Sequence, residues 1–237
     1  MNSIAEKIIL VTGATGGIGG ATARQLSGLG ARLVISGRDA GKLADLEKQL
    51  DGEVLPVTAD ATDESQVEAA YRSAIERYGR LDTLINVPGT STPAQVAEMD
   101  TADFDRLLAV NVKSMFLFSK HFLRQVDPQR GGLIVSISSV AARSANAAAP
   151  VYCAAKAALN MLSDGIQLQG KKNNVRTSLV SPGAVSTPGF WADRPVPHEQ
   201  FLRPEDVADV VAFVVGQPEH VVMHDVVFEP WKFYKNK

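Results

Sequence analysis

The chain has 237 residues, of which 45% are hydrophobic and 21% are charged, and its formal net charge is -2 at pH 7. This composition excludes a disordered chain, a collagen-like repeat and a disulfide-stapled miniprotein, and one domain over residues 1–237 is the simplest organisation. The chain has no basic surplus for nucleic acid, no apolar run approaches the roughly 20 residues of a membrane span, and the lone Cys153 favours a reducing, cytoplasmic location.

Short β-branched runs alternate with longer segments of helical period, which is typical of parallel βαβ units. Seven strands are predicted, at residues 8–11, 32–36, 53–57, 83–85, 133–137, 177–180 and 226–228. Helices are predicted at 21–29, 39–50, 62–78 with Thr62 as the cap, 103–126, 150–171 and 204–215. The predicted fold is therefore a single-domain α/β, Rossmann-type doubly wound parallel sheet of about seven strands with helices on both faces. In such a sheet, ligands bind beyond the carboxyl ends of the strands.

A glycine-rich turn joins the first predicted strand to the first helix. Five of the nine residues from Thr12 to Gly20 are glycine. Glycine lets the backbone approach a ligand closely, and the helix N-terminus that follows favours a pyrophosphate, although an ordinary flexible turn is the simpler alternative. The spacing of Gly13, Gly17 and Gly19 resembles the Thr-Gly-x-x-x-Gly-x-Gly pattern of the short-chain dehydrogenase/reductase family, and the resemblance extends over nearly the whole chain.

The end of the second strand, Ser36-Gly37-Arg38, bears on the choice of cofactor. An acidic side chain there holds the adenosine ribose of NAD, and in this chain Gly37 stands in its place. The guanidinium of Arg38 offers a planar fork for a 2'-phosphate, unless it is only a solvated residue at a helix start. The resemblance therefore implies NADP rather than NAD.

Tyr152 and Lys156 are four residues apart, so that on a helix they share one face. Alone, the pair is as easily a surface contact, but Ser139 and Asn111 complete the family's set in order and approximate spacing. A phenol is a poor acid at neutral pH, and we expect the Lys156 ammonium to lower the pKa of Tyr152. The resemblance implies that Tyr152 exchanges the proton, Ser139 binds the substrate oxygen, Lys156 also binds the nicotinamide ribose, and Asn111 supports a water. Ser138 is the rival serine, and Ser139 is preferred because it directly precedes Val140.

The resemblance implies further cofactor contacts. Asp60 would meet the adenine edge, and Val185 and Thr187, within the Pro-Gly-x-x-x-Thr element, would hold the carboxamide. The complete predicted cofactor set is Gly13, Thr15, Gly17, Ile18, Gly19, Arg38, Asp60, Asn86, Gly89, Tyr152, Lys156, Pro182, Gly183, Val185 and Thr187. The family's usual Asn-Asn-Ala-Gly is replaced here by Asn86-Val87-Pro88-Gly89, which removes a side-chain amide and a backbone donor.

The segment 187–203 is predicted to be a short substrate loop, which suits a small or medium carbonyl or alcohol substrate. Phe190 and Trp191 are candidate apolar walls of the site, and Arg143, Arg194 and His198 are candidate partners for a carboxylate; surface or core duty is the alternative for each. The chain's end weakly resembles the branch with 3-hydroxy acid and serine dehydrogenases. Family resemblance also implies a homodimer or homotetramer, and no metal site is predicted. The competing hypothesis is an NADP(H)-binding sensor without turnover.

Overall fold

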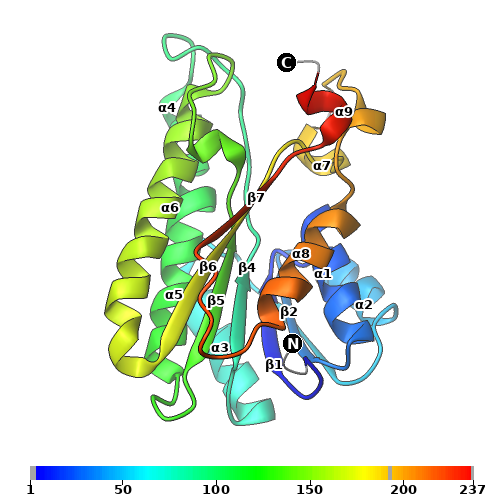
Figure 1. Ribbon diagram of the computed structural model, residues 1–237, viewed down its shortest axis with the longest axis vertical. Helices are drawn as coiled ribbons and strands as arrows, with labels where there is room; N and C mark the ends of the chain where they lie inside the picture. Colours follow the sequence, from blue (N-terminus) through cyan, green and yellow to red (C-terminus); the bar gives the residue numbers. More distant parts are fainter. Residues whose placement is uncertain (1–3, 192–193, 236–237) are drawn as a thin grey trace.

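The structure is a computed structural model that describes residues 4–191 and 194–235. Within them, seven parallel strands form one sheet in the order β3-β2-β1-β4-β5-β6-β7, which confirms the predicted doubly wound sheet (Figure 1). The strands are β1 (Ile8–Thr12), β2 (Arg32–Gly37), β3 (Val54–Thr58), β4 (Thr83–Asn86), β5 (Gly132–Ile137), β6 (Val175–Pro182) and β7 (Asp225–Phe228). Every predicted strand is present in this sheet.

Nine α-helices are described, and the longer ones cover the two faces of the sheet (Figure 1). They are α1 (Gly17–Gly28), α2 (Ala40–Glu47), α3 (Glu64–Tyr78), α4 (Thr101–Leu108), α5 (Ser114–Gln125), α6 (Pro150–Gly170), α7 (Pro188–Trp191), α8 (Pro204–Val215) and α9 (Trp231–Tyr234). One core lies between the sheet and α1, α2 and α8, and the other lies between the sheet and α3, α5 and α6.

The two cores follow from the alternation of side chains along each strand. In β1, Ile9 and Val11 are buried in the first core, whereas Ile8 and Leu10 are buried in the second. A strand that is buried on both faces reads as a continuous apolar run, which is why its sequence predicted it well.

Two helix predictions need correction. Asp63, not Thr62, caps α3, because the Asp63 side chain accepts from the backbone N–H of Gln66. The predicted helix 103–126 is divided into α4 and α5 by a π-helical turn, Ala109–Lys113, which contains Asn111. Such turns insert one extra residue per turn and are common at functional sites.

The strand order reverses direction between β1 and β4, which are neighbours in the sheet but lie far apart in the chain. At this point the connections from the two halves of the sheet run in opposite directions. They leave a crevice outside the carboxyl ends of the strands. The glycine-rich turn follows β1, so it lies at this crevice.

Candidate active site

The glycine-rich turn has no room for side chains where it begins α1. Gly13 has a φ of +64°, and a Cβ on Gly19 would lie 2.2 Å from the carbonyl oxygen of Gly13. The N-cap of α1, Gly16, makes no side-chain cap bond, and Gly16 and Gly17 are exposed. The first N–H groups of the helix are therefore left bare, which suits the pyrophosphate of a dinucleotide.

Three predicted residues, Thr15, Arg38 and Asp60, lie near the ends of β2 and β3. A Cβ on Gly37 would lie 3.0 Å from both Cγ2 and Oγ1 of Thr15, so the turn packs closely against the strand end. Hydrogen bonds from the backbone N–H and hydroxyl of Thr62 lower the pKa of Asp60, and the nearby positive charge of Arg38 contributes to the same shift. Arg38 is exposed, so its guanidinium is accessible to a ligand.

The departure at Val87-Pro88 is accommodated by packing and by Thr12. The Thr12 hydroxyl donates to the carbonyl of Ile85 (3.2 Å) and accepts from the N–H of Val87 (3.3 Å). The ring of Pro88 reaches within 3.3 Å of the position of a Cβ on Gly13, so Pro88 packs on the glycine-rich turn. The strand end is therefore anchored without the amide side chain that Val87 lacks.

Asn86 is buried, and its Nδ2 donates to the hydroxyl of Ser136 on β5 at 3.4 Å. Its Oδ1 has no partner among the described residues. The structure therefore places Asn86 between strands rather than on an open surface.

Tyr152 and Ser139 meet across the crevice. Ser139 follows β5 in an extended conformation, and Pro150 starts α6, which places Tyr152 in the first turn of the helix. The Ser139 side chain acts on the phenol, because it opposes the rise in the pKa of Tyr152 that burial causes. The rival Ser138 is buried and donates to Asn160 instead, which favours Ser139 as the serine facing the phenol.

The predicted acidification of Tyr152 is wrong for the ligand-free protein. Burial raises the pKa of Tyr152 to about 12, and the hydrogen bond with Ser139 opposes this only in part. The Lys156 Nζ lies 5.9 Å from the centre of the Tyr152 ring and donates to the carbonyl of Ile137 at 3.0 Å. Burial lowers the pKa of Lys156 to about 8. Desolvation therefore outweighs the attraction that the four-residue spacing suggested.

The π-helical turn places Asn111 beside Lys156. The buried Asn111 Nδ2 donates to the carbonyls of Thr90 (2.8 Å) and Leu107 (2.9 Å), and its Oδ1 has no partner among the described residues. A Cβ on Gly89 would lie 3.4 Å from both Asn111 Oδ1 and Lys156 Nζ. The two polar atoms therefore border one small space, which glycine leaves open.

Comparison with known proteins identifies this arrangement. Residues 7–196 match the family model for short chain dehydrogenases. The chain belongs to the short-chain dehydrogenase family. An uncharacterised oxidoreductase of Staphylococcus epidermidis is 29% identical over 230 residues, which cover 97% of this chain and 100% of that protein.

Solved short-chain dehydrogenase structures have the same fold. A metagenomic short-chain oxidoreductase in complex with NADP superposes with a TM-score of 0.84 at 31% identity, covering 97% of this chain and 99% of that one. A 7α-hydroxysteroid dehydrogenase in complex with NADH and a 7-oxo bile acid gives a TM-score of 0.88 at 26% identity, covering 95% and 93%. This chain is accordingly an oxidoreductase that uses a nicotinamide cofactor.

In this short-chain dehydrogenase, the segment after β6 closes over the glycine-rich turn. A Cβ on Gly17 would lie 2.8 Å from Cγ2 of Thr187, so Thr187 sits directly on the turn. The carbonyl of Val185 accepts from Trp191 Nε1 at 2.6 Å, and Gly183, after Pro182, donates its N–H to the carbonyl of Phe228 at 2.8 Å. The same carbonyl also accepts from the backbone N–H of Thr187 at 2.9 Å, so both of its lone pairs are used within this segment.

The structure also shows contacts near the predicted site that sequence reasoning missed. Asp225 on β7 accepts from Arg143 and from Ser181, both at 2.6 Å, and so ties the segment after Ser139 to β6. Phe201 and Phe233 join the aromatic side chains of the substrate loop. No motif announces these residues, because their contacts join segments that are distant in sequence.

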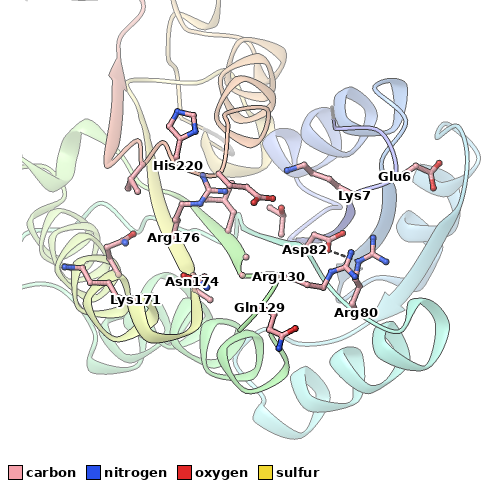
Figure 2. Close-up of a pocket in the computed structure, with 18 of the residues that line it drawn as sticks. Glu6, Lys7, Arg80, Asp82, Gln129, Arg130, Lys171, Asn174, Arg176 and His220 are labelled. Atoms are coloured by element: carbon pink, nitrogen blue, oxygen red, sulfur yellow. Dashed lines mark hydrogen bonds and ion pairs between the residues drawn. The ribbon is translucent and has the colours of Figure 1, made fainter. Parts of the chain in front are cut away.

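The predicted substrate loop at 187–203 includes Ala192 and Asp193, which are not among the residues that the structure describes. A cavity of about 880 Å³ opens at the amino ends of the strands (Figure 2), and none of the predicted site residues is among the residues that line it. In the described part of the chain, no helix has the length and apolar character needed to cross a membrane.

Proposed function

We propose that the protein is an NADP(H)-dependent oxidoreductase that interconverts a carbonyl compound and a secondary alcohol, with Tyr152 as the general acid and base. The observation that carries the proposal is the meeting of Tyr152, Ser139 and Lys156 at the carboxyl edge of the sheet. The Ser139 side chain opposes the rise in the pKa of the phenol, and the Lys156 Nζ lies 5.9 Å from the centre of the phenol ring.

The glycine-rich turn fits the pyrophosphate of the cofactor, since side chains there would collide with backbone. Arg38 would pair with the 2'-phosphate and Asp60 with the adenine edge. Gly89, Val185 and Thr187 would border the nicotinamide, with Lys156 on its ribose. When bound, the reduced nicotinamide supplies the hydride for the carbonyl carbon.

The source of the proton follows from the protonation state of Tyr152. With a pKa of about 12, Tyr152 is protonated at neutral pH and can donate to the substrate oxygen as that oxygen gains charge. Ser139 would hold the same oxygen by a hydrogen bond. A water between Asn111 Oδ1 and Lys156 Nζ would return the proton to Tyr152. In the oxidative direction, Tyr152 would first lose its proton through that water and then accept the proton of the alcohol.

The decisive experiment follows NADPH consumption with a panel of ketones and 3-oxo acids. Tyr152→Phe should lower turnover by about 10²–10⁴-fold while NADPH still binds, because only the proton donor is lost. Tyr78→Phe makes the same chemical change on α3, where the phenol lies 3.5 Å from the carbonyl of Leu33, and should leave turnover unchanged. Equal turnover in Tyr152→Phe and the parent protein would reject the assignment.

The cofactor preference is tested at Arg38. A charge-assisted contact contributes about 1.5–3 kcal/mol, so Arg38→Ala should narrow the NADPH-over-NADH preference by roughly ten- to a hundred-and-fifty-fold. The measurement is kcat/KM for each cofactor. An unchanged ratio of kcat/KM for NADPH to that for NADH would show that Arg38 does not bind the 2'-phosphate.

We also propose a homodimer or homotetramer of single-domain chains. The helices α4, α5 and α6 expose apolar side chains, namely Phe104, Phe116, Met161 and Leu168. Covering such side chains is a common reason for self-association. Light scattering with size-exclusion chromatography measures the mass directly, and a monomer would contradict the proposal. A cytoplasmic location remains a proposal that rests on the single, buried cysteine.

A further inference from the structure

The helix α7 brings an aromatic wall against the phenol of Tyr152. Phe190 packs edge to face on Tyr152, with ring centres 5.8 Å apart. Thr187, immediately before α7, sits on the glycine-rich turn. The short helix therefore spans the space from the cofactor turn to the phenol, and a substrate whose oxygen reached Tyr152 would contact Phe190.

The wall continues through three further rings. Trp191 contacts Phe190 at 5.4 Å and Phe201 at 5.1 Å, and Phe201 contacts Phe233 of α9 at 5.3 Å. α7 and α9 lie at the same end of the molecule (Figure 1). All four rings are only half-buried, so apolar surface beside Tyr152 remains for a ligand to cover.

Two of the cations predicted to meet a carboxylate have a partner in the protein. Arg143 pairs with Asp225 at 2.6 Å, and His198 Nδ1 hydrogen-bonds to the hydroxyl of Ser186 at 2.8 Å. The charge of Arg143 is therefore balanced by a carboxylate, whereas only one of the two ring nitrogens of His198 is engaged.

Arg194 is the third of these cations, and it forms part of the wall itself. Its guanidinium lies over the rings of Trp191 (4.7 Å) and Phe190 (5.5 Å) and donates to the carbonyls of the same two residues. Stacking and hydrogen bonding hold the guanidinium on the wall, but both carbonyls are neutral, so these contacts do not balance the positive charge of Arg194.

We infer that the site selects a carbonyl or alcohol substrate with an aromatic group near the reacting carbon. This inference rests on the proposed function. Phe190 is its specificity-determining residue, because it packs against Tyr152 and leaves apolar surface on which a substrate ring can lie. In the reductive direction, a hydride adds to the carbonyl carbon and the Tyr152 proton adds to its oxygen.

Four matched substrates separate the effect of the ring from that of the charge. They are 3-oxobutanoate, 3-oxo-3-phenylpropanoate and the methyl ester of each. With NADPH, kcat/KM should be about three- to tenfold higher for the phenyl compound than for its 3-oxobutanoate counterpart, both among the esters and among the carboxylates, in line with one aromatic contact. Equal or higher kcat/KM for the 3-oxobutanoate member of either pair would overturn the inference.

The role of Phe190 is tested by substitution. Phe190→Ala should remove the preference for the phenyl esters, mostly through KM, and leave the methyl compounds nearly unchanged. Phe190→Leu keeps apolar bulk and should retain part of the preference. This variant separates loss of the ring contact from unfolding of α7. The control is Phe213→Ala, which removes an exposed ring on α8 and should retain the full preference. An unchanged preference in Phe190→Ala would overturn the assignment.

A binding measurement separates failure of this inference from failure of the proposed function. The chain has two tryptophans, so Trp231→Phe leaves Trp191 as the reporter in the wall. If no compound is reduced, the proposed reaction fails, but quenching of Trp191 emission still ranks the four compounds. Tighter binding of the phenyl ester than of methyl 3-oxobutanoate supports the aromatic wall, and equal binding, the opposite order or no quenching by either rejects it.

Discussion

The two edges of the sheet use polar groups differently. At the amino edge, which surrounds the cavity in Figure 2, Asp82 accepts from the buried N–H of Ile8 and from Arg80, both at 2.8 Å. Arg176 donates to the carbonyls of Pro218 (3.1 Å) and Val221 (2.7 Å). These charged groups tie strand ends and loops together.

At the carboxyl edge, polar groups are buried but left with spare hydrogen-bonding capacity. Asn111 Oδ1 has no partner among the described residues, Lys156 Nζ makes one bond to a backbone carbonyl, and Tyr152 holds its proton to about pH 12. Burying polar groups in this way destabilises the fold unless a ligand completes them. The two edges thus differ in how far the protein itself satisfies their polar groups.

The largest contrast is expected between two lysines, one at each edge. Lys156→Met should lower kcat/KM by about 10²–10³-fold, because it removes the charge beside the phenol. Lys171→Met changes an exposed lysine that lines the cavity of the amino edge and should leave kcat/KM unchanged. Steady-state kinetics measures both, and equal activities would show that the edges do not differ in this way.

The same pair should differ in stability. Burial lowers the pKa of Lys156 from 10.5 to about 8, and a difference of this size corresponds to about 3 kcal/mol of unfavourable desolvation at neutral pH. Lys156→Met should therefore raise the free energy of unfolding of the ligand-free protein by about 1–3 kcal/mol, less the lost bond to Ile137. Denaturant unfolding at pH 7 measures this, and a destabilised variant would contradict the assigned cause.

The pH dependence of kcat/KM should follow the ionisation of Lys156 at the carboxyl edge. Tyr152 remains protonated up to a pKa of about 12, whereas Lys156 loses its charge above a pKa of about 8. The kcat/KM for carbonyl reduction should therefore be level below about pH 8 and fall about tenfold per pH unit above it, since this parameter follows the free enzyme. A level profile to pH 10, with the protein still folded, would exclude Lys156 as the controlling group.

At alkaline pH, Lys156 and Tyr152 should change the free energy of unfolding in opposite directions. A lowered pKa for Lys156 means that the unfolded chain binds more protons between about pH 8 and 10.5, so its contribution to stability rises with pH in that window. The raised pKa of Tyr152 means that the folded state binds more protons between about pH 10 and 12, where its contribution falls. Unfolding curves of Lys156→Met and Tyr152→Phe should each lose one of these dependences.

The strands and most helices could be predicted, because local patterns determine them. The buried run at β1 and the proline that opens α6 each carry their own signal. The cap of α3 was misplaced by one residue because Thr62 and Asp63 are both capping types. The choice between them depends on Asp60, whose carboxylate binds the N–H and hydroxyl of Thr62. The sequence alone does not show that contact.

The site residues were predicted by spacing and resemblance, but their states were not. The apolar period through 103–126 is continuous, and nothing in it marks the π-helical turn that carries Asn111. The sequence places Lys156 near Tyr152 but does not show that the ammonium bonds to the carbonyl of Ile137. Burial and long-range contacts determine both features, and neither is encoded in a local pattern.

A smaller difference, in cofactor affinity, is expected between substitutions at two glycines of α1. Gly17→Ala would place a Cβ 2.8 Å from Thr187, so the closed segment must shift and cofactor Kd should rise about tenfold. Gly28→Ala introduces the same methyl group where nothing lies within 4 Å and should leave Kd unchanged. Isothermal titration with NADP(H) measures both, and equal affinities would show that Thr187 does not close on the cofactor turn.

The smallest effect on activity is expected at the amino edge. Asp82→Ala leaves the buried N–H of Ile8 without its partner and should lower the free energy of unfolding by about 1–3 kcal/mol. Asp45→Ala removes an exposed ion pair with Lys48 and should lower it by less than about 1 kcal/mol. Both variants should keep the parent kcat/KM under conditions where they are folded. A loss of activity in folded Asp82→Ala would mean that the two edges are coupled through β1 and β4, and the division of labour between them would then be wrong.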